Sequence, residues 1–221
     1  MTTTVLTLLG MLTEIQEETG RTSTIQVNAM RRAIEQAIAF YQSNRFWFNE
    51  TRSATFNTVI GTDPYTFSTA TTVGTIPYEF YKIDGVWMTF ATGDVRELDV
   101  MDYSYFEQDA DSQTSNSQPT AYGFIKGAIR FDYAPDAIYS TRIAGHYALP
   151  GPATDNETDN PWMTEAYYLI KSRSKAELFA HRWDDYVAAS AMQTAEQIEL
   201  GSLRDATYDK ARTGYIQATS F

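Results

Sequence analysis

The chain has 221 residues, of which 43% are hydrophobic and 14% aromatic, so it is long and apolar enough to bury a core of its own. Its formal net charge of -11 argues against nucleic-acid binding through the general electrostatic field. The absence of cysteine excludes disulfides and thiolate chemistry within the chain, and two histidines disfavour catalytic triads and histidine-rich metal sites. These counts argue against an enzyme, and no cofactor is predicted. No apolar run approaches the roughly 20 residues that cross a bilayer, so no membrane partner is expected.

The first 48 residues are predicted to form two amphipathic helices. Apolar residues recur at helical spacing over 5–19 and again from about 24 to 43, with a break at 20–24 between them. Three aromatic residues follow the second helix: Phe46, Trp47 and Phe48. Aromatic residues this dense at a helix exit are expected to fill the junction between two substructures.

Residues 49–152 are rich in Thr, Val, Ile and aromatic residues, which predicts an inserted β domain. Strands are expected over 55–60, 65–69, 80–90, 95–105 and 138–149. Alternation on both sides of Lys126-Gly127 predicts a hairpin that joins 122–125 to 129–133. The polar stretch 108–119 predicts a mobile loop, because it holds no large apolar side chain.

Helices are predicted to return after an acidic linker at 153–159. Asn160 suits an N-cap and Pro161 the first helical position, so a helix should begin there and run to Trp183. Another should span 184–203, where apolar residues recur at Val187, Ala191, Ala195 and Ile198. Residues 204–221 are interpreted as a tail. The predicted fold is therefore α+β: a discontinuous helical bundle of two N-terminal and two C-terminal helices, an inserted mainly antiparallel β domain, and an extended C-terminal tail.

The helix expected at 161–183 carries two apolar stripes. The first holds Met163, Tyr167, Ile170, Ser174 and Leu178, and the second holds Leu169, Ala176, Phe179, Ala180 and Trp183. Two stripes predict burial on both sides, either inside this domain or against a second copy. Lys171, Lys175 and Arg182 align between the stripes within ~40° of each other. This basic row is expected either to pair with nearby carboxylates or to face nucleic acid.

The acidic residues of the linker do not complete a metal site. Asp155, Glu157 and Asp159 alternate like the start of a calcium loop. However, Asn160 stands where the sharp-turn glycine belongs and Ala166 where the bidentate glutamate belongs, so a solvated linker is expected.

The remaining polar candidates favour structural roles. Asp184 and Asp185 diverge by ~100° on a helix, so they are expected to begin a helix rather than to act as an acid–base pair. His146 and His181 are expected to be hydrogen-bonded structural residues, with His181 on the apolar side of its helix. No phosphate loop, nucleophile elbow or zinc motif occurs.

The order of elements resembles that of the head-to-tail adaptor proteins of tailed bacteriophages, and of the tail tubular protein A group of short-tailed phages in particular. The matching motifs are Trp47-Phe48-Asn49, Asn160-Pro161-Trp162 and Ala176-x-x-Phe179-x-x-Arg182. The resemblance implies a structural, non-enzymatic virion protein of the neck that is assembled in the host cytoplasm.

What the resemblance implies about partners follows from the role of that family. Such adaptors form a ring, typically a dodecamer, between the portal protein and a downstream tail or nozzle protein, and DNA passes through the channel without specific binding. An acidic wall suits this passage, because it repels phosphate. A ring also needs two different surfaces on each subunit, and the helix with two stripes is expected to supply one through Leu169, Ala176, Phe179 and Trp183.

The resemblance further implies functions for the tail and for the basic row. Tails of this kind reach the portal, and the residues expected to dock there are Tyr208, Arg212, Tyr215, Ile216 and Phe221. The row Lys171, Lys175 and Arg182 is expected to face the channel if it is not used in ion pairs.

Three alternatives stay open. A carbohydrate-binding or tail-fibre-like module would use aromatic residues such as Phe80-Tyr81 and Trp87, and it predicts exposed, coplanar rings. A hydrolase would use carboxylates such as Asp94 and Glu97, and it predicts a concave pocket that holds two carboxyls ~5–10 Å apart. The third is another structural protein of the phage neck or head.

Overall fold

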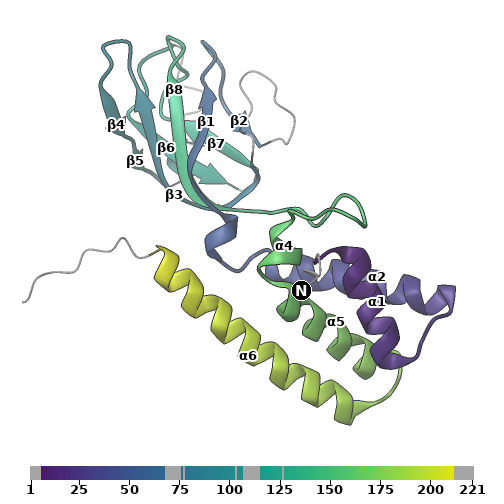
Figure 1. Cartoon of the computed structure of the whole chain (residues 1–221). Helices are drawn as coiled ribbons and strands as arrows, with labels where there is room; N and C mark the ends of the chain where they lie inside the picture. The colour runs from purple at the N-terminus through teal and green to yellow at the C-terminus, as the bar shows by residue number, and fades with distance from the viewer. Residues whose placement is uncertain are drawn as a thin grey trace, which may run out of the picture. The chain divides into compact units, whose positions relative to one another are not determined.

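The structure, a computed structural model, describes residues 6–67, 76, 78–102, 104–106, 115–125 and 127–211. It consists of a helical unit, Met1–Phe48 with Leu149–Phe221, and a β unit, Asn49–Ala148. The fold is α+β, as predicted, with helices from both ends of the chain in one unit and the strands inserted between them (Figure 1). The second boundary lies before Leu149 rather than after residue 152. The Leu149 carbonyl belongs to the helical unit, because it accepts hydrogen bonds from Trp162 Nε1 (2.8 Å) and Gln42 Nε2 (3.2 Å).

The helical unit is built around one core to which every long helix contributes. Its elements are α1 (Leu8–Thr19), α2 (Thr24–Tyr41), the 3-10 helix η1 (Trp47–Asn49), α4 (Pro161–Thr164), α5 (Tyr167–His181) and α6 (Tyr186–Ala211). Ile15, Ile34, Trp162, Ile170 and Leu200 are among the buried residues of this core. The predicted cap at Asn160 is confirmed: its side-chain oxygen accepts a hydrogen bond from the Trp162 backbone N–H at 3.1 Å.

The C-terminal helices differ from the prediction in two ways. The helix expected over 161–183 is broken at Glu165–Ala166, where both backbone N–H groups bond to the Pro161 carbonyl, at 2.8 and 3.2 Å. The predicted tail is wrong for 204–211, because α6 continues to Ala211. Those last turns are held by the protein itself: Leu203 is buried, and Thr207 Oγ1 accepts a hydrogen bond from the Trp47 backbone N–H at 3.3 Å.

The β unit contains two sheets that share one core. The first has the order β1-β8-β3-β4, formed by β1 (Glu50–Asn57), β8 (Ser140–Tyr147), β3 (Phe80–Thr89) and β4 (Val95–Glu97). The second has the order β2-β7-β6-β5, formed by β2 (Tyr65–Thr66), β7 (Ala128–Phe131), β6 (Ala121–Ile125) and β5 (Asp99–Val100). Among the named strands of the described residues, β5–β6 pair in parallel and the other pairs are antiparallel. Buried residues from both sheets form a single apolar cluster, which is the arrangement of a β-sandwich.

The hairpin predicted at 122–133 is confirmed as β6–β7, in which Tyr122 pairs with Phe131. The strand expected over 95–105 is instead divided: β4 lies in one sheet, β5 lies in the other, and residues 104–106 are helical. Of the loop predicted at 108–119, residues 108–114 lie outside the described residues.

Candidate functional site

The three junction aromatics pack within the helical unit. Phe46 and Phe48 are buried and stack with ring centroids 5.3 Å apart, and Trp162 meets both rings edge-on at 6.1 and 5.2 Å. Trp47 is half-buried, with Lys210 Nζ 3.3 Å from its ring centroid. These residues close the core where α2 ends and α4 begins, and they fasten the end of α6 to it.

The assignment of α5 as a subunit interface is wrong for Leu169 and Ala176, two of the four residues predicted for it. Leu169 and Ala176 are only 2% and 4% exposed, because α6 packs along this side of α5 within the same chain (Figure 1). Phe179 and Trp183 are half-buried and contact each other at 5.0 Å. The Trp183 Nε1–H donates to Gln26 Oε1 of α2 at 3.1 Å. The second stripe therefore stabilises the monomer and cannot contact a second copy through Leu169 or Ala176.

The basic row is mostly used in ion pairs with α1. Lys171 Nζ lies 2.6 Å from carboxylate oxygens of both Glu14 and Glu18, and Lys175 Nζ lies 2.7 Å from Glu18. Burial lowers the pKa of Lys171, but the hydrogen bonds to the two glutamates outweigh burial, so the net pKa is raised. Arg182 is exposed at the end of α5. Two of the three predicted channel-facing cations are thus neutralised, and the row does not exist as a free basic surface.

The residues predicted to dock on the portal lie at or beyond the end of α6. Tyr208 is exposed on the helix itself and does not belong to a separate tail. Arg212, Tyr215, Ile216 and Phe221 lie outside the described residues.

α6 exposes an almost uncharged surface that sequence analysis did not recognise. The helix packs on α5 through the side that carries Ala189, Glu196, Leu200 and Leu203, all buried. At ~100° per residue, the opposite side is made of exposed residues. We call these residues the outer face of α6: Val187, Ser190, Ala191, Thr194, Ile198, Gly201 and Ser202.

The outer face is unusual for a helix surface in contact with water. Val187 is 84% and Ile198 66% exposed. Between Tyr186 and Leu203 the only charged residues are Glu196, which is buried, and Glu199, although 20% of the whole chain is charged. Depletion of charge with exposed aliphatic side chains is typical of the centre of a protein interface. The repeat of Val187, Ala191 and Ile198 was visible in the sequence, but one sequence cannot tell whether such a stripe faces the core or the outside.

A shallow groove of about 330 Å³ lies between α2 and α5, on a different part of the helical unit. Its buried residues are Ala29, Ala33 and Leu178. Its more exposed residues are Arg32 and Gln36 of α2, with Glu177, His181 and Arg182 at the end of α5. Glu177 is already paired with Arg173 at 2.6 Å, so the two guanidinium groups at the groove make it locally basic.

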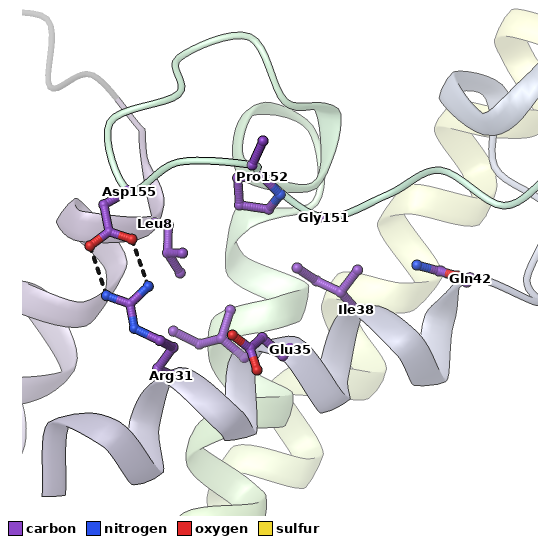
Figure 2. Close-up of a pocket in the computed structure, with 10 residues that line it drawn as sticks. Leu8, Arg31, Glu35, Ile38, Gln42, Gly151, Pro152 and Asp155 are labelled. Carbon is purple, nitrogen blue, oxygen red and sulfur yellow. Dashed lines mark hydrogen bonds and ion pairs between the residues drawn. The ribbon is translucent and has the colours of Figure 1, made fainter. Parts of the chain in front are cut away.

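A second pocket, of about 270 Å³, lies between α2 and residues 151–155 (Figure 2). Leu8, Ile34 and Ile38 form its apolar wall. At one end Arg31 donates two hydrogen bonds to Asp155, at 2.6 and 2.7 Å. These hydrogen bonds lower the pKa of Asp155, so this carboxylate stays ionised and is unsuited to act as a general acid.

The acidic residues of the linker bind protein groups. Glu157 accepts hydrogen bonds from the Ala153 backbone N–H (2.6 Å) and from Asn160 Nδ2 (3.3 Å). Across the part of the chain that the structure describes, no three acidic or histidine side chains are grouped to hold a metal ion. Asp185 accepts from the Ala188 backbone N–H at 3.0 Å, which is the expected role at a helix start.

The two histidines differ in environment. His146 is buried in β8 and stacks against Tyr81 at 5.4 Å. The expectation that His181 lies on the apolar side of its helix is wrong: it is exposed at the end of α5, with Nε2 3.3 Å from Glu177. His181 is the last residue of α5 and lies beyond the part of the helix that α2 and α6 cover.

The structure also locates the residues named for the two alternative functions, carbohydrate binding and hydrolysis. Of the rings considered for carbohydrate binding, Phe80 is buried, Tyr81 is exposed, and Trp87 is half-buried beneath the Arg142 guanidinium at 4.5 Å. Asp94 and Glu97 are exposed at the edge strand β4 and the turn before it, and neither lines the groove or the pocket described above.

Comparison of the chain with protein-family models and with curated proteins found no match. Among the helices of the described residues, none combines the length and the apolar composition needed to cross a membrane.

Proposed function

We propose that this protein is a structural subunit of a tailed-phage virion, a head-to-tail adaptor that forms a ring between the portal and the tail and leaves a channel for DNA. The proposal begins from the resemblance in element order and motifs. The discontinuous helical unit with an inserted β unit is the architecture that the resemblance implies.

The observation that carries the proposal is the outer face of α6. A monomer gains nothing from a long exposed surface without charge, whereas a subunit of a ring needs such a surface for its neighbour. Because Leu169 and Ala176 of α5 are buried within their own chain, the proposed contact with the next copy begins from α6 instead. The proposed ring is a dodecamer by analogy with the family.

The net charge of -11 supports the DNA channel in the same proposal. Phosphate is repelled by an acidic wall and bound by a basic one in a salt-dependent manner. Since Lys171 and Lys175 are paired with glutamates, they are not available to retain the passing DNA.

The test compares two substitutions of the same kind. Ile198→Glu places a charge on the outer face of α6, and Ile138→Glu places one at a similarly exposed isoleucine of the β unit (66% and 69% exposed). In phage particles assembled with each variant, the chain should be lost from the neck with Ile198→Glu and retained with Ile138→Glu. Cryo-electron microscopy of intact particles and quantification of the chain provide the measurement. Full incorporation of the Ile198→Glu variant, or wild-type chain located outside the neck, overturns the proposal.

A further inference from the structure

We infer that the outer face of α6 binds the groove between α2 and α5 of a second copy of this chain. This inference rests on the proposed function and deepens it, since it names both surfaces of the contact between neighbouring subunits. The two surfaces lie on different helices, so the contact is heterologous: each copy inserts its α6 into one neighbour and receives the α6 of another.

Shape supports this pairing. The floor of the groove is formed by two alanines of α2 and by Leu178 of α5, which are buried, and the short alanine side chains leave the surface hollow there. The outer face offers Val187 and Ile198 as protruding side chains, separated by small residues that allow two helices to approach closely. Helices associate when side-chain ridges on one helix pack into grooves on the surface it meets.

Charge supports it independently. Beyond Ile198, the exposed side of α6 becomes acidic at Asp205 and Asp209, and Asp205 lies about 10 Å farther along the helix axis. The groove carries Arg32 and Arg182. Within the described residues, neither of these arginines nor either aspartate forms an ion pair in its own chain. Two copies of a chain with a net charge of -11 repel each other, so a local basic surface that accepts acidic residues favours a contact at this place.

A second copy explains these features better than an unrelated partner. An unrelated partner would account for one surface at a time, whereas a second copy satisfies the apolar face, the groove and both sets of charges together. The resulting contact is apolar at its centre and charged at its rim, which is the usual composition of a protein interface.

The chain has no cysteine, so single cysteines can report the contact directly. Ile198→Cys chains are mixed with tagged Gln36→Cys chains and treated with a short bismaleimide, which captures weak encounters even if the protein is monomeric at rest. Glu17→Cys, at an exposed position of α1, is the matched control partner for Ile198→Cys. We expect a cross-linked heterodimer with Gln36→Cys in at least fivefold excess over that with Glu17→Cys.

The outcomes separate this inference from the proposed function. Strong cross-linking of Ile198→Cys to itself means that the outer faces meet each other, and it overturns the docking into the groove. Equal yields with Gln36→Cys and Glu17→Cys also overturn it. In either case, loss of the Ile198→Glu variant from the phage neck would leave the proposed function standing. Conversely, specific cross-linking by a chain that is absent from the neck would support the contact and reject the adaptor function.

Charge reversal supplies a second readout at exposed positions, where folding is not at risk. In the Gln36→Cys partner, the added change Arg32→Glu should lower the cross-link yield to the level of the Glu17→Cys control. Adding Asp205→Lys to the Ile198→Cys chain should then recover at least half of the wild-type yield. A yield that is unaffected by Arg32→Glu contradicts the assigned charge pairing.

Discussion

Replacing Glu196 with alanine is expected to destabilise the helical unit by about 2–3 kcal/mol. Glu196 is a carboxylate on the buried side of α6, only 3% exposed. It accepts a hydrogen bond from the Tyr41 hydroxyl of α2 and another from Arg173 of α5, at 3.3 Å. Burial, followed by the hydrogen bond to Glu196, raises the pKa of Tyr41 far above its ordinary value, so this hydroxyl stays protonated and donates. One side chain thereby connects three helices.

The magnitude follows from what each partner loses. The Tyr41 hydroxyl would be left buried without an acceptor, at a cost of about 1–3 kcal/mol. Removing the Cγ methylene of Glu196 from the core costs about 0.8 kcal/mol more. Part of this is offset because a charged carboxylate no longer has to be buried. Arg173 adds little, since it keeps its ion pair with Glu177 (2.6 Å) and its contact with the Phe40 ring (4.2 Å).

Urea unfolding followed by tryptophan fluorescence measures this loss. A Trp87→Phe background removes the tryptophan of the β unit, so that the signal comes from the helical unit alone. Gln197→Ala, at the exposed neighbouring position, is the matched control and should change stability by less than about 0.5 kcal/mol. Glu196→Gln should lose less than Glu196→Ala, because an amide oxygen can still accept from Tyr41. If Glu196→Ala and Gln197→Ala unfold at the same urea concentration, the assigned network does not stabilise the protein.

Three further changes have distinct signs. Gly201→Ala should stabilise the helical unit by about 0.5–1 kcal/mol, because this glycine lies within α6 and an added Cβ meets nothing within 4 Å; a lower melting temperature by circular dichroism would contradict this. Gly145→Ala should destabilise the β unit by about 3 kcal/mol, because its Cβ would lie 2.3 Å from the Lys82 backbone oxygen and force β3 and β8 apart; unchanged unfolding of the β-unit tryptophan would refute it. Burial raises the pKa of Glu18, but hydrogen bonds from its two lysine partners outweigh burial, so the net pKa is lowered. The stability that ionised Glu18 contributes is therefore complete above its ordinary pKa of 4.5. It is lost as the pH falls through the lower pKa of the folded state. The Glu18→Gln variant should therefore lose less stability than the wild type below about pH 5, by at most about 1 kcal/mol, since the ion pairs are partly exposed. Urea unfolding at a series of pH values from about 6 to about 2 measures this difference. A variant as sensitive to acid as the wild type would exclude the effect.

Features set by local signals could be predicted from the sequence. The cap at Asn160 depends on one side chain and a neighbouring proline, and the hairpin β6–β7 depends on alternation around a turn. The α+β class follows from the segregation of helical and strand patterns along the chain. The break at Glu165–Ala166 could not be predicted, because no Gly or Pro interrupts the helical pattern there.

The candidate site required non-local information. Both apolar stripes of α5 were recognised, but the sequence does not state whether the second is covered by the same chain or by another. The buried side of α6 includes Glu196, a residue that a hydrophobic pattern assigns to the surface, while Val187 and Ile198 fit a core pattern and face outward. Glu196 can be buried because Tyr41 and Arg173, which are distant in sequence, satisfy its carboxylate.

The helical unit nevertheless limits where an assembly surface can be. A helix with two apolar sides must find two partners, and α5 finds both within its own chain, in α2 and α6. Covering α5 in this way leaves α6 at the edge of the unit, with one side packed and one side unpartnered. The helix of this unit that still lacks a partner on one side is therefore α6 rather than α5. For a chain with this much negative charge, contact with a second copy is favoured where a surface is uncharged or basic. In the described helical unit, the outer face of α6 is the uncharged surface and the groove with Arg32 and Arg182 is the basic one.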